Sequence, residues 1–206
     1  MVNLDCTLHG HFNMDFKKNT TALLISLLIA CMATWPLIVD PTTNISRHFD
    51  LYGVFWLAEG TQHLTEGMFT HINFPLEAPI GHVDSWLWFI LFWVNHDIIP
   101  IPILISLLVT ISIGLNIWSA RWCALAWGVG PVASWCAGLI FGLSGSMLNA
   151  ILEGSWYLSS QFWLPLIAVS LLRFQQTKQL KWHGLMTISW LGSLLTSAYL
   201  GLASSV

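Results

Sequence analysis

Long, nearly uncharged apolar stretches constrain this chain more than any other feature of its sequence. A transmembrane helix needs about 20 mostly apolar residues. The chain as a whole has 8% charged residues, whereas a soluble domain has roughly 25%. We therefore predict an all-α fold, a polytopic bundle of about five transmembrane helices. The stretches that qualify are roughly 20–39, 98–119, 130–150, 157–173 and 184–204.

The first apolar stretch, 20–39, follows Lys17 and Lys18 and does not end in a small-residue cleavage site. A cleavable signal peptide has a shorter apolar region that does end in such a site. The stretch is therefore predicted to be a retained first span, preceded by a cytoplasmic N-terminal segment, 1–19. The chain also ends directly after its last apolar stretch, so we expect it to be the N-terminal part of a longer protein.

A shorter apolar run, Trp86–Val94, decides the orientation of every later span. If it lies in the membrane interface, all seven Lys and Arg residues except Arg47 face the cytoplasm. If it spans, two face the cytoplasm and five face outside. Cytoplasmic loops of membrane proteins carry an excess of Lys and Arg. Residues 84–97 are therefore predicted to be an interfacial or re-entrant helix within a long extracytoplasmic loop, 40–97.

The long loop 40–97 holds the first candidate site residue. Loops this long are usually functional or disordered, and this one is rich in aromatic and aliphatic residues. Asp50–Leu64 contains no Pro and is predicted to form an amphipathic helix on the membrane surface. Burial of the Asp50 carboxylate is costly without a cation or hydrogen-bond partners. Asp50 is either part of a solvated surface or a group that binds a metal–phosphate or acts as a base.

The second candidate is Glu153, the only charged residue between Arg121 and Arg173. It lies in the short outer connection predicted between the third and fourth spans. It is either a helix-end carboxylate in the headgroup layer or a second acidic group that faces the same cavity as Asp50. Trp156, close to it, is either an anchor at the membrane interface or a platform on which a sugar stacks.

Other motifs predict structure rather than chemistry. Gly138 and Gly142 form a GxxxG pattern, which lets helices pack closely in lipid. The four cysteines lack the spacing of a metal site or a redox motif. The chain has no basic patch, so nucleic acid is not expected as a partner.

The chain resembles polytopic glycosyltransferases of the GT-C superfamily, especially bacterial GT-C-like membrane proteins. The resemblance covers roughly 20–175. In that superfamily a first span is followed by a large extracytoplasmic loop with membrane-surface helices and an early acidic residue. The residues that carry the resemblance are Phe49–Tyr52 with Trp56, Thr70–Pro75, Phe141–Ser144, Leu152–Gly154 and Trp163–Leu166.

The resemblance implies transfer of a sugar from a polyprenyl-phosphate-linked donor on the extracytoplasmic side, in the inner or plasma membrane of a bacterium. It implies that Asp50 is the catalytic base or a metal-linked carboxylate, with Mg²⁺ or Mn²⁺ as the expected metal. Glu153 would be a second catalytic acid. Membrane lipid and the donor are the expected partners. The residues expected to bind the substrate are Tyr52, Trp56, His71 and Trp156.

Two other function classes stay open. A transporter or channel would carry ionisable residues along its path, but the main polar residues of the spans are Asn116, Asn149 and Gln161, all predicted near span ends. No inverted repeat is visible. A non-catalytic membrane assembly subunit would use the GxxxG pattern and the Trp-rich surfaces as interfaces. We rank sugar transfer first.

Overall fold

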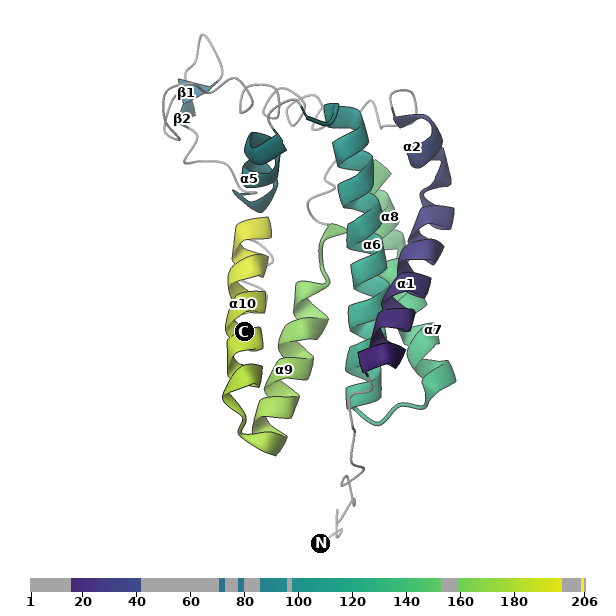
Figure 1. Ribbon diagram of the computed structural model, residues 1–206, viewed down its shortest axis with the longest axis vertical. Coiled ribbons are helices and arrows are strands. Elements are labelled where there is room, and N and C mark those ends of the chain that lie inside the picture. The colour runs from purple at the N-terminus through teal and green to yellow at the C-terminus, as the bar shows by residue number, and fades with distance from the viewer. Residues whose placement is uncertain are drawn as a thin grey trace, which may run out of the picture.

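The computed structural model of the protein is almost entirely helical in the residues that it describes (Figure 1), which confirms the predicted all-α class. Most of the helices run side by side along one axis. The described residues are 16–41, 71–72, 78–79, 86–95, 98–152, 159–197 and 205.

The first predicted span, 20–39, is divided into two helices. α1 covers Phe16–Ala33 and α2 covers Trp35–Val39. Thr34 separates them, and Pro36 lies in the first turn of α2. Proline suits a first turn because its missing N–H has no partner there, but it disrupts a helix interior. A new helix therefore begins where a single span was predicted.

α6, Ile101–Ala126, is the central helix of the bundle. Its 26 residues give a length of about 39 Å at about 1.5 Å per residue, so it ends well after the predicted boundary of the span 98–119. It packs against α1, α7 and α9. Because α6 contacts all three of these helices (Figure 1), it positions most of the bundle.

The predicted span 130–150 also consists of two helices, α7 (Pro131–Gly142) and α8 (Gly145–Leu152). Ser144 lies between them and caps α8, because its Oγ accepts a hydrogen bond of 3.4 Å from the Met147 N–H. A serine oxygen at this position replaces a partner that the first N–H groups of a helix lack.

The close helix packing predicted from the GxxxG pattern is confirmed. A Cβ built on Gly138 would lie 2.5 Å from the carbonyl oxygen of Ile117 in α6. A Cβ on Gly142 would meet the Ile117 side chain and would lie 3.0 Å from its backbone nitrogen. Only the absence of both side chains lets α7 approach the backbone of α6 this closely.

The last two helices form a hairpin. α9 covers Trp163–Thr177 and α10 covers Leu180–Thr196, and the two pack against each other along their length (Figure 1). Lys178 ends α9 in the left-handed region, with φ of 56°. The predicted spans 157–173 and 184–204 overlap these helices but are shifted along the chain.

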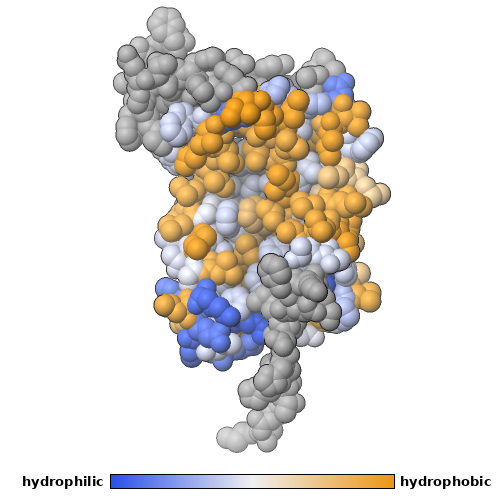
Figure 2. Space-filling view, viewed as in Figure 1, coloured by the Kyte–Doolittle hydropathy of each residue, from blue (hydrophilic) through white to orange (hydrophobic). Residues whose placement is uncertain are grey.

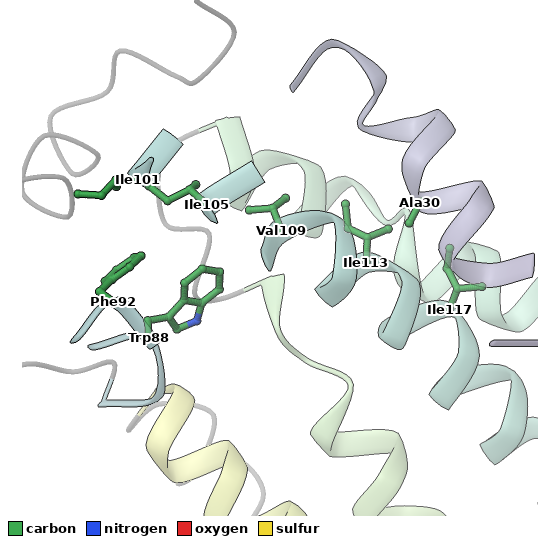
Figure 3. Packing of buried hydrophobic residues seen from close by; sticks show 8 residues of the cluster. All are labelled: Ala30, Trp88, Phe92, Ile101, Ile105, Val109, Ile113 and Ile117. Atoms are coloured by element: carbon green, nitrogen blue, oxygen red, sulfur yellow. The ribbon is translucent and has the colours of Figure 1, made fainter. Parts of the chain in front are cut away.

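α5, Trp86–Asn95, is a helix as predicted. It contacts α10 and lies beyond the C-terminal end of that helix in Figure 1. Its Trp88 and Phe92 point toward Ile101 and Ile105 at the start of α6 (Figure 3). Its interfacial or re-entrant position in a membrane stays a prediction.

A short β pair, which the sequence did not predict, is described within the long loop. β1 (His71–Ile72) runs antiparallel to β2 (Ala78–Pro79), with His71 opposite Pro79. The surface helix predicted over Asp50–Leu64 lies outside the described residues.

Two clusters of buried apolar side chains hold the helices together. In the first, residues at every fourth position of α6 form one stripe that faces α1 and α5 (Figure 3). Residues at this spacing share one face of a helix. The second joins α6 to the α9–α10 hairpin and contains Trp122, Ala126, Leu166, Val169 and Trp182. The residues of the first cluster, which joins α6 to α1 and α5, are Ala30, Trp88, Phe92, Ile101, Ile105, Val109, Ile113 and Ile117.

Polarity elsewhere in the bundle is reversed relative to a soluble protein. Large apolar side chains cover much of the visible surface (Figure 2), and Val132 and Ile140 are 77% and 73% exposed. Small hydroxyl residues are buried instead, many of them bonded to a carbonyl of their own helix, as Ser26 Oγ is to Ala22 at 2.9 Å. The fully buried serines are Ser26, Ser119, Ser134, Ser159, Ser170, Ser189, Ser193 and Ser197.

Among the described residues, two helical stretches are long and apolar enough to cross a membrane. They are α6 and Pro131–Asn149, which joins α7 to most of α8. Asn19–Ala33 of α1 and the helix α5 are apolar but shorter. The remaining predicted spans, the extent of the loop 40–97 and the orientation in a membrane stay predictions.

Candidate functional site

The two helices that precede the predicted acidic residues Asp50 and Glu153 end at the same end of the bundle. α2 leads into the segment that contains Asp50, and α8 leads into the segment that contains Glu153. Both helices finish at the same end, near α5 and the start of α6 (Figure 1). Asp40, at the C-cap of α2, lies at this end and is the one acidic residue among the described residues.

The predicted site residues themselves lie mostly outside the described part of the chain. This applies to both predicted catalytic acids and to the aromatic residues expected to bind substrate. His71 is described, as part of β1, and its predicted contact with substrate stays untested. The residues outside the described ranges are Asp50, Tyr52, Trp56, Glu153 and Trp156.

A buried polar cluster lies inside the bundle, between α6 and the chain on either side of residues 153–158. Its central residue is Asn116, which is 0% exposed. The Asn116 Nδ2 donates a hydrogen bond of 2.6 Å to the carbonyl oxygen of Ser159. The same nitrogen lies 3.6 Å from the Met147 sulfur in α8. Asn116 therefore joins α6 to the helix before that segment and to the residue after it.

A second contact lies one helical turn away on the same face of α6. The Ser112 and Ser160 hydroxyl oxygens are 2.8 Å apart, and both side chains are buried. Ser112 and Asn116 are four residues apart, so their side chains are neighbours on the helix surface. Together the two contacts fix residues 159–160 to α6.

The cluster retains one hydrogen-bond acceptor. The Asn116 Oδ1 is buried and has no hydrogen-bond partner among the described residues. An unpaired buried polar atom costs about 1–3 kcal/mol, so this oxygen favours any hydroxyl or amide donor brought to it. The cluster is neutral, and it suits a hydroxyl group better than a charged group.

The sequence assigned Asn116 to the neighbourhood of a span end, and the structure corrects this. α6 continues to Ala126, which places Asn116 inside the helix, fully buried. The spacing of residues along the sequence does not single out Ser112, Ser159 or Ser160. The one available signal was an amide residue in a strongly apolar stretch, because such a group needs a partner in lipid.

The prediction that Asp50 binds Mg²⁺ or Mn²⁺ is not tested by the structure. Within the described ranges, no group of three or more His, Cys, Asp or Glu residues could hold a metal ion. Asp50, the predicted ligand of Mg²⁺ or Mn²⁺, lies outside those ranges.

The opposite end of the bundle is basic. Arg121 lies near the end of α6 and Arg173 near the end of α9, while Lys178 and Lys181 flank the start of α10. These helix ends lie together in Figure 1, and hydrophilic side chains gather there in Figure 2. The grouping that the charge count predicted is therefore present in the fold.

Comparison of the chain with protein-family models, with curated proteins and with solved structures finds no match.

Proposed function

We propose that the protein is an integral membrane glycosyltransferase of GT-C type. It transfers a sugar from a polyprenyl-phosphate-linked donor to an acceptor at the end of the bundle where α2 and α8 finish. The N-terminus lies in the cytoplasm, and the membrane is the inner or plasma membrane of a bacterium.

The observation that carries the membrane part of this proposal is the reversed polarity of the bundle. Val132 and Ile140 are largely exposed, whereas Ser119 and Ser134 are fully buried. Exposed apolar surface of this extent favours lipid over water. Small residues and bonded hydroxyl groups at helix contacts are typical of helices that associate in a bilayer.

The choice of the reacting end follows from charge. Lys and Arg favour the cytoplasmic side, and the basic residues of α6, α9 and α10 share the end opposite to α2 and α8. The reaction is then extracytoplasmic. The lipid-linked donor would place its prenyl chain along the apolar helices and its phosphate at the membrane surface.

The proposed chemistry uses both acidic residues, Asp50 and Glu153. The acceptor hydroxyl attacks the anomeric carbon of the sugar, Asp50 takes the hydroxyl proton, and the bond between that carbon and the donor phosphate breaks. Glu153 acts as a second acid on the same face. Asp50 is also the candidate ligand of Mg²⁺ or Mn²⁺, which would offset the charge of the phosphate oxygens. The sugar is bound by Tyr52, Trp56, His71 and Trp156.

The test uses the full-length protein in proteoliposomes that contain a polyprenyl-phosphate sugar. We expect Asp50→Asn to lose at least about 100-fold in transfer rate, the typical contribution of a general base, while its membrane level stays unchanged. The matched control is Asp40→Asn, which neutralises an acid at the same end of the bundle. Full activity of Asp50→Asn would remove this residue from the mechanism.

A second candidate function, transport of a small hydroxylated solute, is favoured by one observation. The Asn116 Oδ1 is an unpartnered acceptor, among the described residues, inside one of the two apolar helices long enough to cross a membrane. Polar groups in that position often mark a substrate path. Solute uptake by vesicles that is lost in Asn116→Leu, without any sugar transfer by the wild type, would favour this function.

A further inference from the structure

The turn between α9 and α10 carries three basic residues and no acidic residue of its own. We call residues 173–181 the hairpin tip. It contains Arg173, Lys178 and Lys181, and no Asp or Glu occurs anywhere in residues 154–206. The tip therefore lacks a carboxylate from its own hairpin.

The start of α10 adds to this imbalance. α10 has no acidic residue in its first turn, and Gln179 at its N-cap makes no side-chain capping bond. A helix N-terminus carries a partial positive charge that acidic residues stabilise and cations destabilise. Lys178 and Lys181 flank this terminus, so the local field favours an anion.

The side chains of the two lysines contact only neutral rings in the described interactions. The Lys178 Nζ lies 5.8 Å from the ring centre of Phe174. The Lys181 Nζ lies 5.4 Å from the ring centre of Trp182. Both residues are exposed, so their ammonium groups remain able to bind a phosphate.

The backbone at Lys178 is strained in a way that a glycine would relieve. Its φ of 56° is in the left-handed region, where helix C-caps usually have Gly or Asn because a Cβ is unfavourable. Strained non-glycine residues often occur at functional sites. Here the strained residue is Lys178, whose side chain carries an ammonium group, in the turn between α9 and α10.

Apolar side chains lie next to the hairpin tip. Leu180 is 80% exposed, and Leu171 and Ile188, farther along the two helices, are also exposed. A free phosphate ion has no apolar group that could pack against this surface. A phospholipid does, because its acyl chains can cover the leucine and isoleucine side chains while its phosphate meets the lysines.

We propose that the hairpin tip binds the headgroup of an anionic phospholipid, with Lys178 and Lys181 as the residues that contact the phosphate. This inference rests on membrane insertion, which is part of the proposed function, and it is independent of sugar transfer. Bound lipid would hold the basic end of the bundle at a negatively charged membrane surface.

The test compares the full chain in nanodiscs of phosphatidylcholine with the chain in nanodiscs that also contain phosphatidylglycerol. We expect phosphatidylglycerol to raise the Tm of the wild type. The double variant Lys178→Gly/Lys181→Gln should bind phosphatidylglycerol about 30-fold more weakly, because each lysine at an anionic surface contributes about a factor of five. The control is Lys178→Arg/Lys181→Arg, which keeps both positive charges and should keep the shift.

Lys178→Gly alone separates the lipid contact from the fold. Relief of strain should raise its Tm in pure phosphatidylcholine, while its gain from phosphatidylglycerol shrinks. An undiminished gain in the double variant would overturn the proposal, and so would an equal gain from inorganic phosphate added to phosphatidylcholine nanodiscs. Failure of the wild type to enter nanodiscs would refute membrane insertion itself. Loss of sugar transfer alone would leave the lipid site standing.

Discussion

Asn116 is a fully buried polar residue that contacts two other parts of the chain. Its amide nitrogen bonds to the carbonyl of Ser159 and contacts the sulfur of Met147. One side chain thus joins three separate parts of the chain. With the contact between Ser112 and Ser160, it holds α8 and residues 159–160 against α6.

We predict that Asn116→Leu lowers the free energy of unfolding by about 0.5–1.5 kcal/mol, because one of the two hydrogen bonds to the Ser159 carbonyl is lost while the Gln161 N–H still donates to it. The change is measured by thermal or denaturant unfolding in mild detergent. Gln175→Leu replaces an amide residue by leucine at an exposed position of α9, and should alter stability by no more than about 0.5 kcal/mol. Equal effects of the two variants would show that the amide contact contributes nothing.

The burial of small polar residues was the feature of the structure that was hardest to predict from the sequence. Hydropathy showed that the stretches were apolar, but not which face of each helix is inside. Ser112 and Ser160 are separated by many residues and meet only because α6 and the chain before α9 pack together. The pairing of distant hydroxyl groups depends on tertiary contacts, which spacing along one helix does not encode.

At the scale of the helices, backbone breaks were the main difference from prediction. A hydropathy average takes no account of a proline that suits a first turn, as at Pro36, or of a serine that caps a helix, as at Ser144. Two predicted spans are therefore each divided. Helix type was predictable because apolar stretches of this length in lipid must satisfy their own backbone hydrogen bonds.

The contact between α6 and α7 gives a second prediction. Gly138→Ala should lower stability by about 1–3 kcal/mol, because overpacking forces the backbones apart. Gly184→Ala is the matched control inside α10, where an added Cβ meets nothing within 4 Å. Since alanine favours helices, that variant should gain about 0.5–1 kcal/mol. Opposite signs in the same unfolding measurement confirm the contact, and a gain in both variants would refute it.

For the whole molecule, charge separates the two ends of the bundle. The described basic residues of α6, α9 and α10 lie at one end, and Asp40 lies at the other. The sequence predicted this grouping because each span reverses direction. It did not reveal the neutral cluster around Asn116, which lies between the two ends and carries no charge to count.

Orientation can be tested in a cysteine-free background with a reagent that does not cross membranes. We predict that cysteines at Gly60 and Glu153 are labelled from outside, whereas one at Gln176, beside the basic turn, is labelled only after the membrane is permeabilised. Mass spectrometry of intact cells and of lysates gives the readout. Protection of position 153 together with labelling of position 176 would reverse the proposed topology.

The central place of α6 has a consequence for biogenesis. During synthesis α1 emerges first, yet its main partner is α6, which follows only after the long loop. In a protein inserted as proposed, the first helix would wait in the membrane or at the translocon without its principal contact, whereas α7 and α9 would each find α6 already made. Conditions that delay insertion of α6 should leave α1 as the segment most open to premature degradation.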